Sequence, residues 1–356
     1  MSTNFGKERD GIHFSILEDD GYGKPFVYVF SPREPGKTTS MLLDKVYPAY
    51  KKGTPFCIMV NKTVEVTDEL ILSFERTIND FKGYEVHLET KGAFDAGVRT
   101  VLTKEKKVFC FIVAWSTPLT RLKRINLGKL GGIWFDEAQP NVAIGEKYEK
   151  GLAEKWNEFM TTQTRNCYPK MLRCYFTSNF YSRYHPVLQY IGCDCRKLEI
   201  GKKFVGDKWL VDCYQLKPEL RDYILAHNPY YQFDDTYSKY FQGIAIADEN
   251  VPIMETKPEG CGLYCGFKTD YGYLWIWRQN GNRPGTNAYW IDLTKERPGK
   301  KQDVFIIDFK DMDGGGYMLK PYASLFGSLK AHLANGKAFF SSPGAFQACA
   351  DVWAVL

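Results

Sequence analysis

Apolar and polar positions along the first 200 residues follow two alternating patterns. Short apolar runs rich in β-branched and aromatic residues predict buried strands at residues 25–31, 55–62, 99–103, 108–115, 132–135 and 171–177. Longer stretches with apolar residues three or four apart predict helices at residues 38–52, 67–82 and 148–164. The run of charged residues at 104–107 predicts the tip of a hairpin between two of the strands. This alternation predicts an α/β fold with a mostly parallel sheet between helices.

The pattern changes after about residue 200. A strand-like stretch reaches Leu216, a short helix is expected at 219–226, and residues 228–240 are aromatic and acidic without a clear period. From about Val251 the chain is rich in glycine and in strand-like runs, with hairpins expected at 268–273 and 279–287 and a closing helix at 322–335. We therefore expect a domain over residues 1–200, a linker region over 201–250 and a β-rich α+β domain over 251–356.

Composition limits the class of protein. The chain has 356 residues, 44% of them hydrophobic and 25% charged, which is typical of a globular protein with two domains. It contains no apolar run of eighteen residues and its first residues are polar, so we expect neither a membrane span nor a secretory signal. The net charge of +5 fits nucleic-acid binding and fits an ordinary solvated surface equally well.

The ten cysteines show no framework spacing. Without an export signal they are expected to be reduced and mostly buried. The pairs Cys193 with Cys195 and Cys261 with Cys265 lack the spacing of a zinc site, so no structural zinc is expected.

The loop after the first expected strand carries phosphate-binding chemistry. The strand runs into S-P-R-E-P-G-K-T, and a helix follows. Gly36, Lys37 and Thr38 match the last three positions of the Walker A phosphate loop. Gly36 permits the close turn, Lys37 can reach the β- and γ-phosphates, and Thr38 can hold Mg²⁺, while the start of the helix favours phosphate. Thr39 joins these three as a predicted ATP-binding residue.

The loop also departs from the Walker A template. Ser31 stands where the template has its first glycine, and Pro32 and Pro35 have no backbone N–H to offer a phosphate. These departures bear on the geometry of the phosphate cradle rather than on the existence of the site.

A second motif completes the predicted nucleotide site. G-G-I-W-F-D-E at residues 131–137 is an apolar strand that ends in two acids, which is the Walker B pattern. Asp136 is expected to hold Mg²⁺ through water, and Glu137 to polarise the attacking water. An acid directly after the Walker B aspartate, with extra strands between the two motifs, indicates the hydrolysing (ASCE) branch of P-loop proteins.

The strand after Glu137 ends in Thr177-Ser178-Asn179. Polar side chains at this end of a central strand can face the γ-phosphate, so Ser178 and Asn179 are predicted as sensor residues; the alternative is a strand-end cap. Arg165 follows a helix and precedes this strand, where a ring ATPase places an arginine finger that acts on the ATP of a neighbouring subunit. An ordinary surface arginine is the alternative for that position.

A basic run, R-L-K-R-I-N-L-G-K, precedes the Walker B strand. Phosphate contacts from such residues give the sequence-independent, salt-sensitive binding that a translocating protein needs. An exposed loop with ordinary charges explains the run equally well. The predicted DNA-binding residues are Arg121, Lys123, Arg124 and Lys129.

These motifs together resemble the DNA-packaging ATPases of the phi-29 type, which are relatives of the large terminases. The resemblance is carried by R-E-P-G-K-T after a strand, I-W-F-D-E-A, and T-R-N followed by a strand ending in T-S-N. It implies ATP hydrolysis that drives double-stranded DNA into a preformed procapsid, by a homopentameric ring at the portal vertex. Arg33 matches an early basic residue of the family's Walker A motif.

The resemblance also implies a setting and partners. A protein of this family works in the host cytoplasm and transiently at the procapsid portal (connector), with ATP and Mg²⁺ as cofactors, and a structural packaging RNA is left open. In large terminases the C-terminal domain is an RNase H-like nuclease with carboxylates on two metals. Here residues 263–268 contain no acid, and Asp270, Asp292 and Asp308 lie in a turn or at strand ends, which favours a degenerate, nucleic-acid-binding domain.

Three alternatives remain from the sequence. The chain could be another ring-forming or helicase-type DNA-dependent ATPase, or an active terminase that keeps its nuclease. It could also be a catalytically silent P-loop adaptor that only binds DNA or a capsid. ATP turnover with DNA and procapsid separates these classes.

Overall fold

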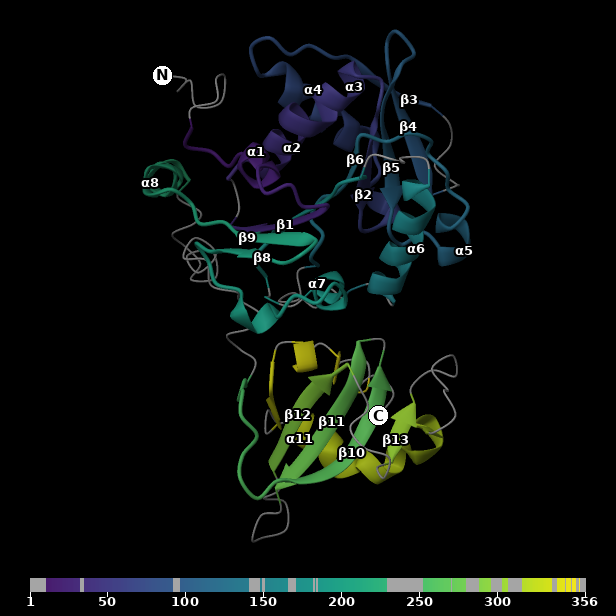
Figure 1. Ribbon diagram of the computed structural model, residues 1–356, viewed down its shortest axis with the longest axis vertical. Helices are drawn as coiled ribbons and strands as arrows, with labels where there is room; N and C mark the ends of the chain where they lie inside the picture. The colour runs from purple at the N-terminus through teal and green to yellow at the C-terminus, as the bar shows by residue number, and fades with distance from the viewer. Residues whose placement is uncertain are drawn as a thin grey trace. The chain divides into compact units, whose positions relative to one another are not determined.

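The computed structural model describes most of the chain and divides it into two compact units. The described residues are 11–32, 35–91, 97–140, 148, 151–165, 171–181, 183, 185–228, 252–269, 271–279, 288–295, 303–306, 316–334, 338–342, 344–346, 348, 349 and 352. The first unit comprises residues 1–181, 190–193 and 197–246, and the second comprises 182–189, 194–196 and 247–356. Each unit contains a β-sheet of its own (Figure 1).

The first unit is built on a sheet of nine strands among the described residues, in the order β3-β4-β5-β2-β6-β7-β1-β9-β8. Strands β5, β2, β6, β7, β1 and β9 are all parallel, whereas β3, β4 and β8 pair antiparallel at the two edges. The strands are β1 Phe26–Ser31, β2 Phe56–Val60, β3 Leu88–Lys91, β4 Val98–Thr103, β5 Val108–Ala114, β6 Gly132–Phe135, β7 Cys174–Asn179, β8 Lys203–Val205 and β9 Trp209–Cys213. The expected α/β fold and the hairpin of β4 and β5 are confirmed.

Helices are present where the pattern predicts them at 38–52, 67–82, 148–164 and 219–226, and five further short helices among the described residues were not predicted. The helices are α1 Ile16–Asp20, α2 Lys37–Met41, η1 Leu42–Val46, α3 Tyr47–Lys51, η2 Thr63–Glu65, α4 Asp68–Asn79, α5 Leu119–Leu122, α6 Leu152–Thr164, α7 Pro186–Tyr190, η5 Cys195–Lys197 and α8 Pro218–His227. The helix expected at 38–52 is continuous from α2 to α3, with a π-helical turn at η1, and Gly53 ends it with φ +69°. Helix α6 begins after Gly151, later than the expected residue 148.

The sheet of the first unit has a different apolar layer on each face. On one face, side chains from α2, η1, α3 and α4 pack against inward residues such as Val29, Ile58 and Trp134. On the other face, Trp156 of α6 contacts the rings of Phe26 and Phe176 edge to face. Because both faces are covered, the central strands are buried along their whole length, which is why their sequences are continuous apolar runs.

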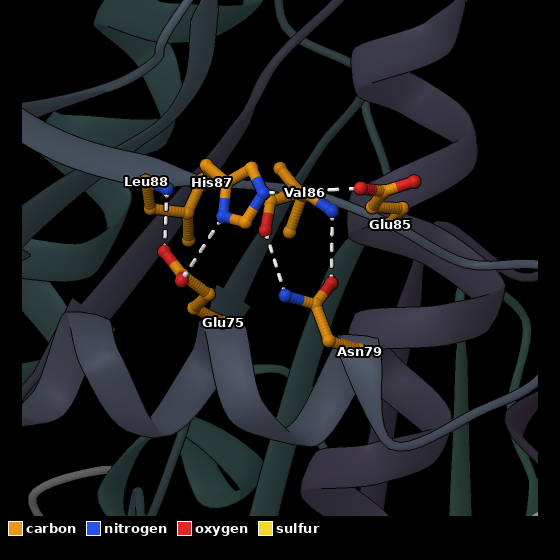
Figure 2. A network of polar contacts seen from close by, with 6 residues as sticks. All are labelled: Glu75, Asn79, Glu85, Val86, His87 and Leu88. Carbon is orange, nitrogen blue, oxygen red and sulfur yellow. Dashed lines mark hydrogen bonds and ion pairs between the residues drawn. The ribbon is translucent and has the colours of Figure 1, made fainter.

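Helix α4 also fixes the segment that leads into the edge strand β3. Its Asn79 side chain accepts from the Val86 N–H and donates to the Val86 carbonyl, both at 2.8 Å, as Figure 2 shows. One turn earlier, the Glu75 carboxylate accepts from the Leu88 N–H and lies 3.4 Å from Nδ1 of His87. These contacts give hydrogen-bond partners to the backbone groups of Val86 and Leu88. Such groups need side-chain partners because β3, at the edge of the described sheet, has a neighbouring strand on one side only.

The first sheet continues past residue 200. Strands β8 and β9 form a hairpin, and β9 pairs parallel with β1 from Phe26 opposite Trp209 to Phe30 opposite Cys213. This stretch is expected in the linker region, but in the structure β9 is the second neighbour of the phosphate-loop strand β1. Helix α8, expected at 219–226, follows it, and residues 229–251 lie outside the described part of the chain.

The second unit contains a six-stranded sheet in its described part, in the order β14-β13-β10-β11-β12-β15. Strands β10, β11 and β12 are antiparallel, and β13 and β14 continue parallel to β10 on the other side. The elements are β10 Gly262–Thr269, β11 Gly272–Gln279, β12 Ala288–Thr294, β13 Val304–Ile306, β14 Tyr317–Met318, η8 Lys320–Phe326, α11 Gly327–Ala334 and β15 Ala338–Phe340. The β-rich pattern, the hairpin at 268–273 and the closing helix are confirmed.

One face of this second sheet packs against η8 and α11. Phe267, Ile276 and Ile291 from three strands meet Phe326 and Leu329 there. All five side chains are buried, so this unit has a core of its own.

Candidate nucleotide site

The phosphate loop leaves β1 at Ser31 and enters α2 at Lys37. Gly36 caps the helix with φ +88°, a left-handed conformation that glycine adopts without a steric penalty. A Cβ at this position would lie 3.6 Å from the His13 ring, so the segment before α1 passes close to the loop. Thr39 follows on α2 and is half-buried. Arg33, predicted to bind ATP, lies outside the described residues.

Lys37 is buried, and oxygen atoms surround its ammonium group. Nζ donates to Oγ of Ser31 at 2.7 Å, to the Pro32 carbonyl at 3.2 Å and to Oδ1 of Asn179 at 3.2 Å. An ammonium group can donate three hydrogen bonds, so these acceptors hold it in a defined place at the end of β1. Ser31, the departure from the Walker A template, therefore supplies an oxygen that a glycine could not.

The Asp136 carboxylate lies directly after β6, between the helix that follows the phosphate loop and the neighbouring strand β7. Oδ2 lies 3.4 Å from Oγ1 of Thr38, and Oδ1 accepts from Oγ1 of Thr177 at 2.9 Å. Burial, with the nearby Glu137 charge, raises the Asp136 pKa to about 6, while the Thr177 hydrogen bond and Lys37 act in the other direction. Thr38 and Asp136 together offer the hard oxygen ligands that Mg²⁺ prefers.

Glu137 follows with an uncommon backbone conformation. Its φ is +44°, which costs energy for a residue that has a Cβ, and its side chain is exposed. The Asn61 side-chain amide donates to the Glu137 carbonyl at 2.7 Å, and the Glu137 N–H donates to Oδ1 of Asp136 at 3.1 Å. These bonds hold the backbone of Glu137 in this conformation.

Asn61 is a site residue that the sequence analysis missed. It follows β2, whose carboxyl end lies beside that of β6 in the sheet. Its signal in the sequence is weak, because a polar residue after a buried strand is common.

The Thr177-Ser178-Asn179 sequence ends β7, the strand between β1 and β6. Thr177 contacts Asp136 and Asn179 contacts Lys37, so the end of this strand joins the two motifs. Asn179 also donates to the Tyr181 hydroxyl at 3.2 Å. Ser178 donates to the Asn179 carbonyl at 2.6 Å instead, so its hydroxyl is directed along its own strand.

Arg165 is the C-cap of α6 and is exposed. No hydrogen bond or ion pair joins its guanidinium to the residues that the structure describes. The action of Arg165 on the ATP of a neighbouring copy of the chain stays a prediction.

The four basic residues predicted to bind DNA are all exposed. Arg121 lies on α5, Lys123, Arg124 and Lys129 follow it, and Lys123 forms an ion pair with Glu158 of α6 at 3.3 Å. Exposure is required of a DNA contact but does not distinguish one from an ordinary surface charge, so their role stays a prediction.

The described residues contain no group of three or more His, Cys, Asp or Glu side chains that could hold a metal ion. Cys193, Cys195, Cys261 and Cys265 form no disulfide within the described part of the chain. In the same part of the chain, no helix is both long and apolar enough to cross a membrane.

Comparison with known proteins gives structural relatives only. No protein-family model matches the chain, and no curated protein matches its sequence significantly. The chain is similar to a solved structure described as the bacteriophage Phi-29 viral genome packaging motor assembly, with a TM-score of 0.61 and 17% identity over 96% of this chain and 97% of that one. It is also similar to the Phi-28 gp11 DNA packaging motor, with a TM-score of 0.59 and 14% identity over 98% of both chains. The chain has the fold of these phage packaging motors.

The similarity extends over nearly the whole chain and therefore includes both units. The resemblance that the motifs predict is confirmed at the level of the fold. At 14% and 17% identity it does not by itself transfer an activity.

Proposed function

We propose that this protein is an ATP-driven motor that translocates double-stranded viral DNA into a preformed procapsid. The observation that carries the proposal is the meeting of Lys37, Asp136 and Glu137 at the carboxyl ends of β1 and β6, in a chain with the fold of packaging motors. Ligands of open α/β sheets bind at this end of the strands.

The strand order supports a P-loop fold of the ASCE type for the first unit. Strand β7 separates the phosphate-loop strand β1 from the Walker B strand β6, and an acid follows Asp136 directly. This is the arrangement expected of the hydrolysing branch, because the inserted strand brings polar side chains between the two motifs.

The residues fit ATP hydrolysis as follows. Lys37 places a positive charge where the β- and γ-phosphates would lie, and Thr38 and Asp136 would hold Mg²⁺. Bound Mg²⁺ neutralises phosphate charge. Glu137, exposed beside Asp136, would accept a proton from the attacking water, and Asn179 would respond to the phosphates through Lys37. Arg165 would act on the ATP of the neighbouring subunit.

The second unit is proposed to be an RNase H-like domain that no longer cuts DNA. The strand order of its sheet supports that fold. Three antiparallel strands, β12, β11 and β10, are followed by β13 and β14, which run parallel to β10. The central strand β10 carries no acid, and Asp292 lies on β12 away from it. Asp270 and Asp308 lie outside the described residues.

A DNA-binding role for this unit is supported by its surface cations. Lys257, Lys268 and Arg278 lie over the rings of Trp277, Tyr273 and Tyr264, at 4.2, 4.3 and 4.7 Å from the ring centres. Aromatic rings beneath cations keep positive charge at defined places, which suits contacts to a phosphate backbone.

The proposed partners follow from the packaging role. They are double-stranded DNA, the portal or connector of the procapsid, and further copies of this chain in a ring that we propose to be a pentamer. A structural packaging RNA is an additional proposed partner. The protein would act in the host cytoplasm and transiently at the portal vertex.

ATP turnover tests the proposal. Purified protein should hydrolyse ATP, and double-stranded DNA together with empty procapsids should raise the rate above that with DNA alone. Stimulation by DNA without any effect of procapsids would favour another ring-forming or helicase-type ATPase. Metal-dependent DNA cleavage would favour an active terminase, and no turnover under any condition would favour a silent adaptor.

A further inference from the structure

Three side chains from neighbouring strands form a directed hydrogen-bond chain that ends on Asp136. The Trp134 indole N–H donates to Oγ1 of Thr177 at 2.8 Å, and Oγ1 of Thr177 donates to Oδ1 of Asp136 at 2.9 Å. Trp134 and Thr177 are fully buried. The chain therefore runs from the core of the sheet to the edge of the nucleotide site.

Strand geometry produces this chain. Trp134 pairs with Tyr175 and Phe135 with Phe176 in the parallel ladder of β6 and β7. Side chains two residues apart share a face of a strand. Trp134 and Asp136 therefore lie on one face of the β6 chain, and Tyr175 and Thr177 lie on the same face of β7. Continuing the register puts Thr177 beside Asp136 and diagonal to Trp134, close enough for both contacts.

The direction of the chain is set by its first member. An indole nitrogen can only donate, so the Thr177 hydroxyl accepts from Trp134 and its single proton is directed to Asp136. The same Oδ1 accepts from the Glu137 N–H at 3.1 Å. The Thr177 hydroxyl and the Glu137 N–H therefore both bind Oδ1 of Asp136. The other oxygen, Oδ2, faces Thr38.

We propose that Thr177 is a positioning residue, oriented by Trp134, that fixes the Asp136 carboxylate so that Oδ2 is presented to the divalent cation. The inference rests on the proposed role of Asp136 in binding Mg²⁺. Residues that hydrogen-bond a metal ligand commonly change metal affinity by roughly 10- to 100-fold when they are removed. The hydroxyl of Thr177 is the group that does this, because it donates the hydrogen bond to the carboxylate.

The test measures binding of Mn²⁺ in the presence of ADP, by electron paramagnetic resonance, to the full-length protein. Thr177→Val keeps the shape of the side chain without its hydroxyl and should weaken Mn²⁺ binding at least roughly tenfold. Thr177→Ser keeps the hydroxyl and should bind Mn²⁺ as the parent does. The Mg²⁺ concentration for half-maximal ATP turnover should rise in Thr177→Val and not in Thr177→Ser.

The second unit offers a matched control. There, Nε1 of Trp275 donates to Oγ1 of Thr294 at 2.9 Å, so Thr294→Val removes an equivalent hydroxyl from a tryptophan–threonine pair that, among the described residues, contacts none of the nucleotide-site motifs. Its Mn²⁺ binding should equal that of the parent. An equal loss in both valine variants would overturn the proposal, because the effect would then come from the fold.

Asp136→Asn separates the inference from the proposed function. If Asp136→Asn loses Mn²⁺ and Thr177→Val binds it as tightly as the parent, Thr177 does not position the carboxylate and the inference is wrong. If Asp136→Asn itself binds Mn²⁺ like the parent, the metal role of Asp136 fails, and the inference fails with it.

Discussion

The ammonium group of Lys37 lies 2.7 Å from the hydroxyl oxygen of Ser31, the residue that replaces the first glycine of the phosphate-loop template. Both side chains are buried at the end of β1. The substitution that weakens the match to the motif therefore adds an acceptor for the motif's lysine, so a departure from the template contributes to the geometry of the site.

Ser31→Ala should raise the KM for ATP. The change removes one acceptor from Lys37, and a hydrogen bond contributes about 1 kcal/mol, or roughly fivefold in affinity. Steady-state kinetics at saturating Mg²⁺ measure the shift. Ser31→Thr keeps a hydroxyl and serves as the control; an unchanged KM in Ser31→Ala would mean that Ser31 does not help to hold the lysine.

Glu137→Gln should bind ATP normally and hydrolyse it very slowly. The amide cannot take a proton from water, whereas Thr38 and Asp136 are unchanged. Binding of a fluorescent ATP analogue and release of phosphate measure the two steps separately. Lys37→Ala, which loses the charge on the phosphates, should show no turnover, and a Glu137→Gln variant that also loses binding would assign Glu137 to the metal.

Arg165→Ala should bind ATP and scarcely hydrolyse it. A finger supplied to a neighbouring subunit contributes on the order of 10³-fold or more to the rate in other nucleotidases. Mixing this variant with Lys37→Ala subunits, which keep the finger, should restore part of the activity. If mixed rings form and remain inactive, Arg165 does not act in trans.

Plasmid DNA should remain uncut by this protein in Mg²⁺ or Mn²⁺. The reason is that β10 presents no carboxylate for a two-metal centre. Gel electrophoresis after long incubation checks the expectation. Robust cutting that Asp292→Asn or Asp308→Asn abolishes would establish a working nuclease.

Asp19→Asn should make the protein relatively more stable as pH rises. Asp19 is buried beside Asp212, and burial first, then the Asp212 charge, raises its pKa from 3.8 to about 7, although Lys203 pairs with both. A carboxyl with a raised pKa stabilises the folded state when it is protonated. Its contribution is therefore full below pH 4 and is lost as pH rises toward about 7.

Urea unfolding between pH 4 and pH 8 measures this difference. The stability of Asp19→Asn relative to the parent should increase over pH 4 to 7, by at most about 1.4 kcal/mol per pH unit for one proton, and stay level above. A flat difference for Asp19→Asn would show that Asp19 is ionised throughout.

The amino-acid sequence by itself determined the elements and the two motifs. Apolar runs predicted β1, β2, β5, β6 and β7, because the strands are buried on both faces. Gly36, Lys37 and Thr38 at a strand–helix junction predicted the phosphate loop, since each residue type answers a local demand of phosphate binding. The residues of each strand or motif lie within a few positions of one another, so each can be recognised without knowledge of the rest of the chain.

The tertiary structure alone decided which strands became neighbours. Lys37 meets Asn179, 142 positions away, and Thr177 meets Asp136 because β7 lies between β1 and β6. The stretch with β8 and β9, expected in a linker, completes the sheet on the other side of β1. Any buried parallel strand can pair with several others, so local periodicity does not select its partner. The choice is made by packing over the whole domain, and the contacts of Ser31, Asn61 and Thr177 follow from it.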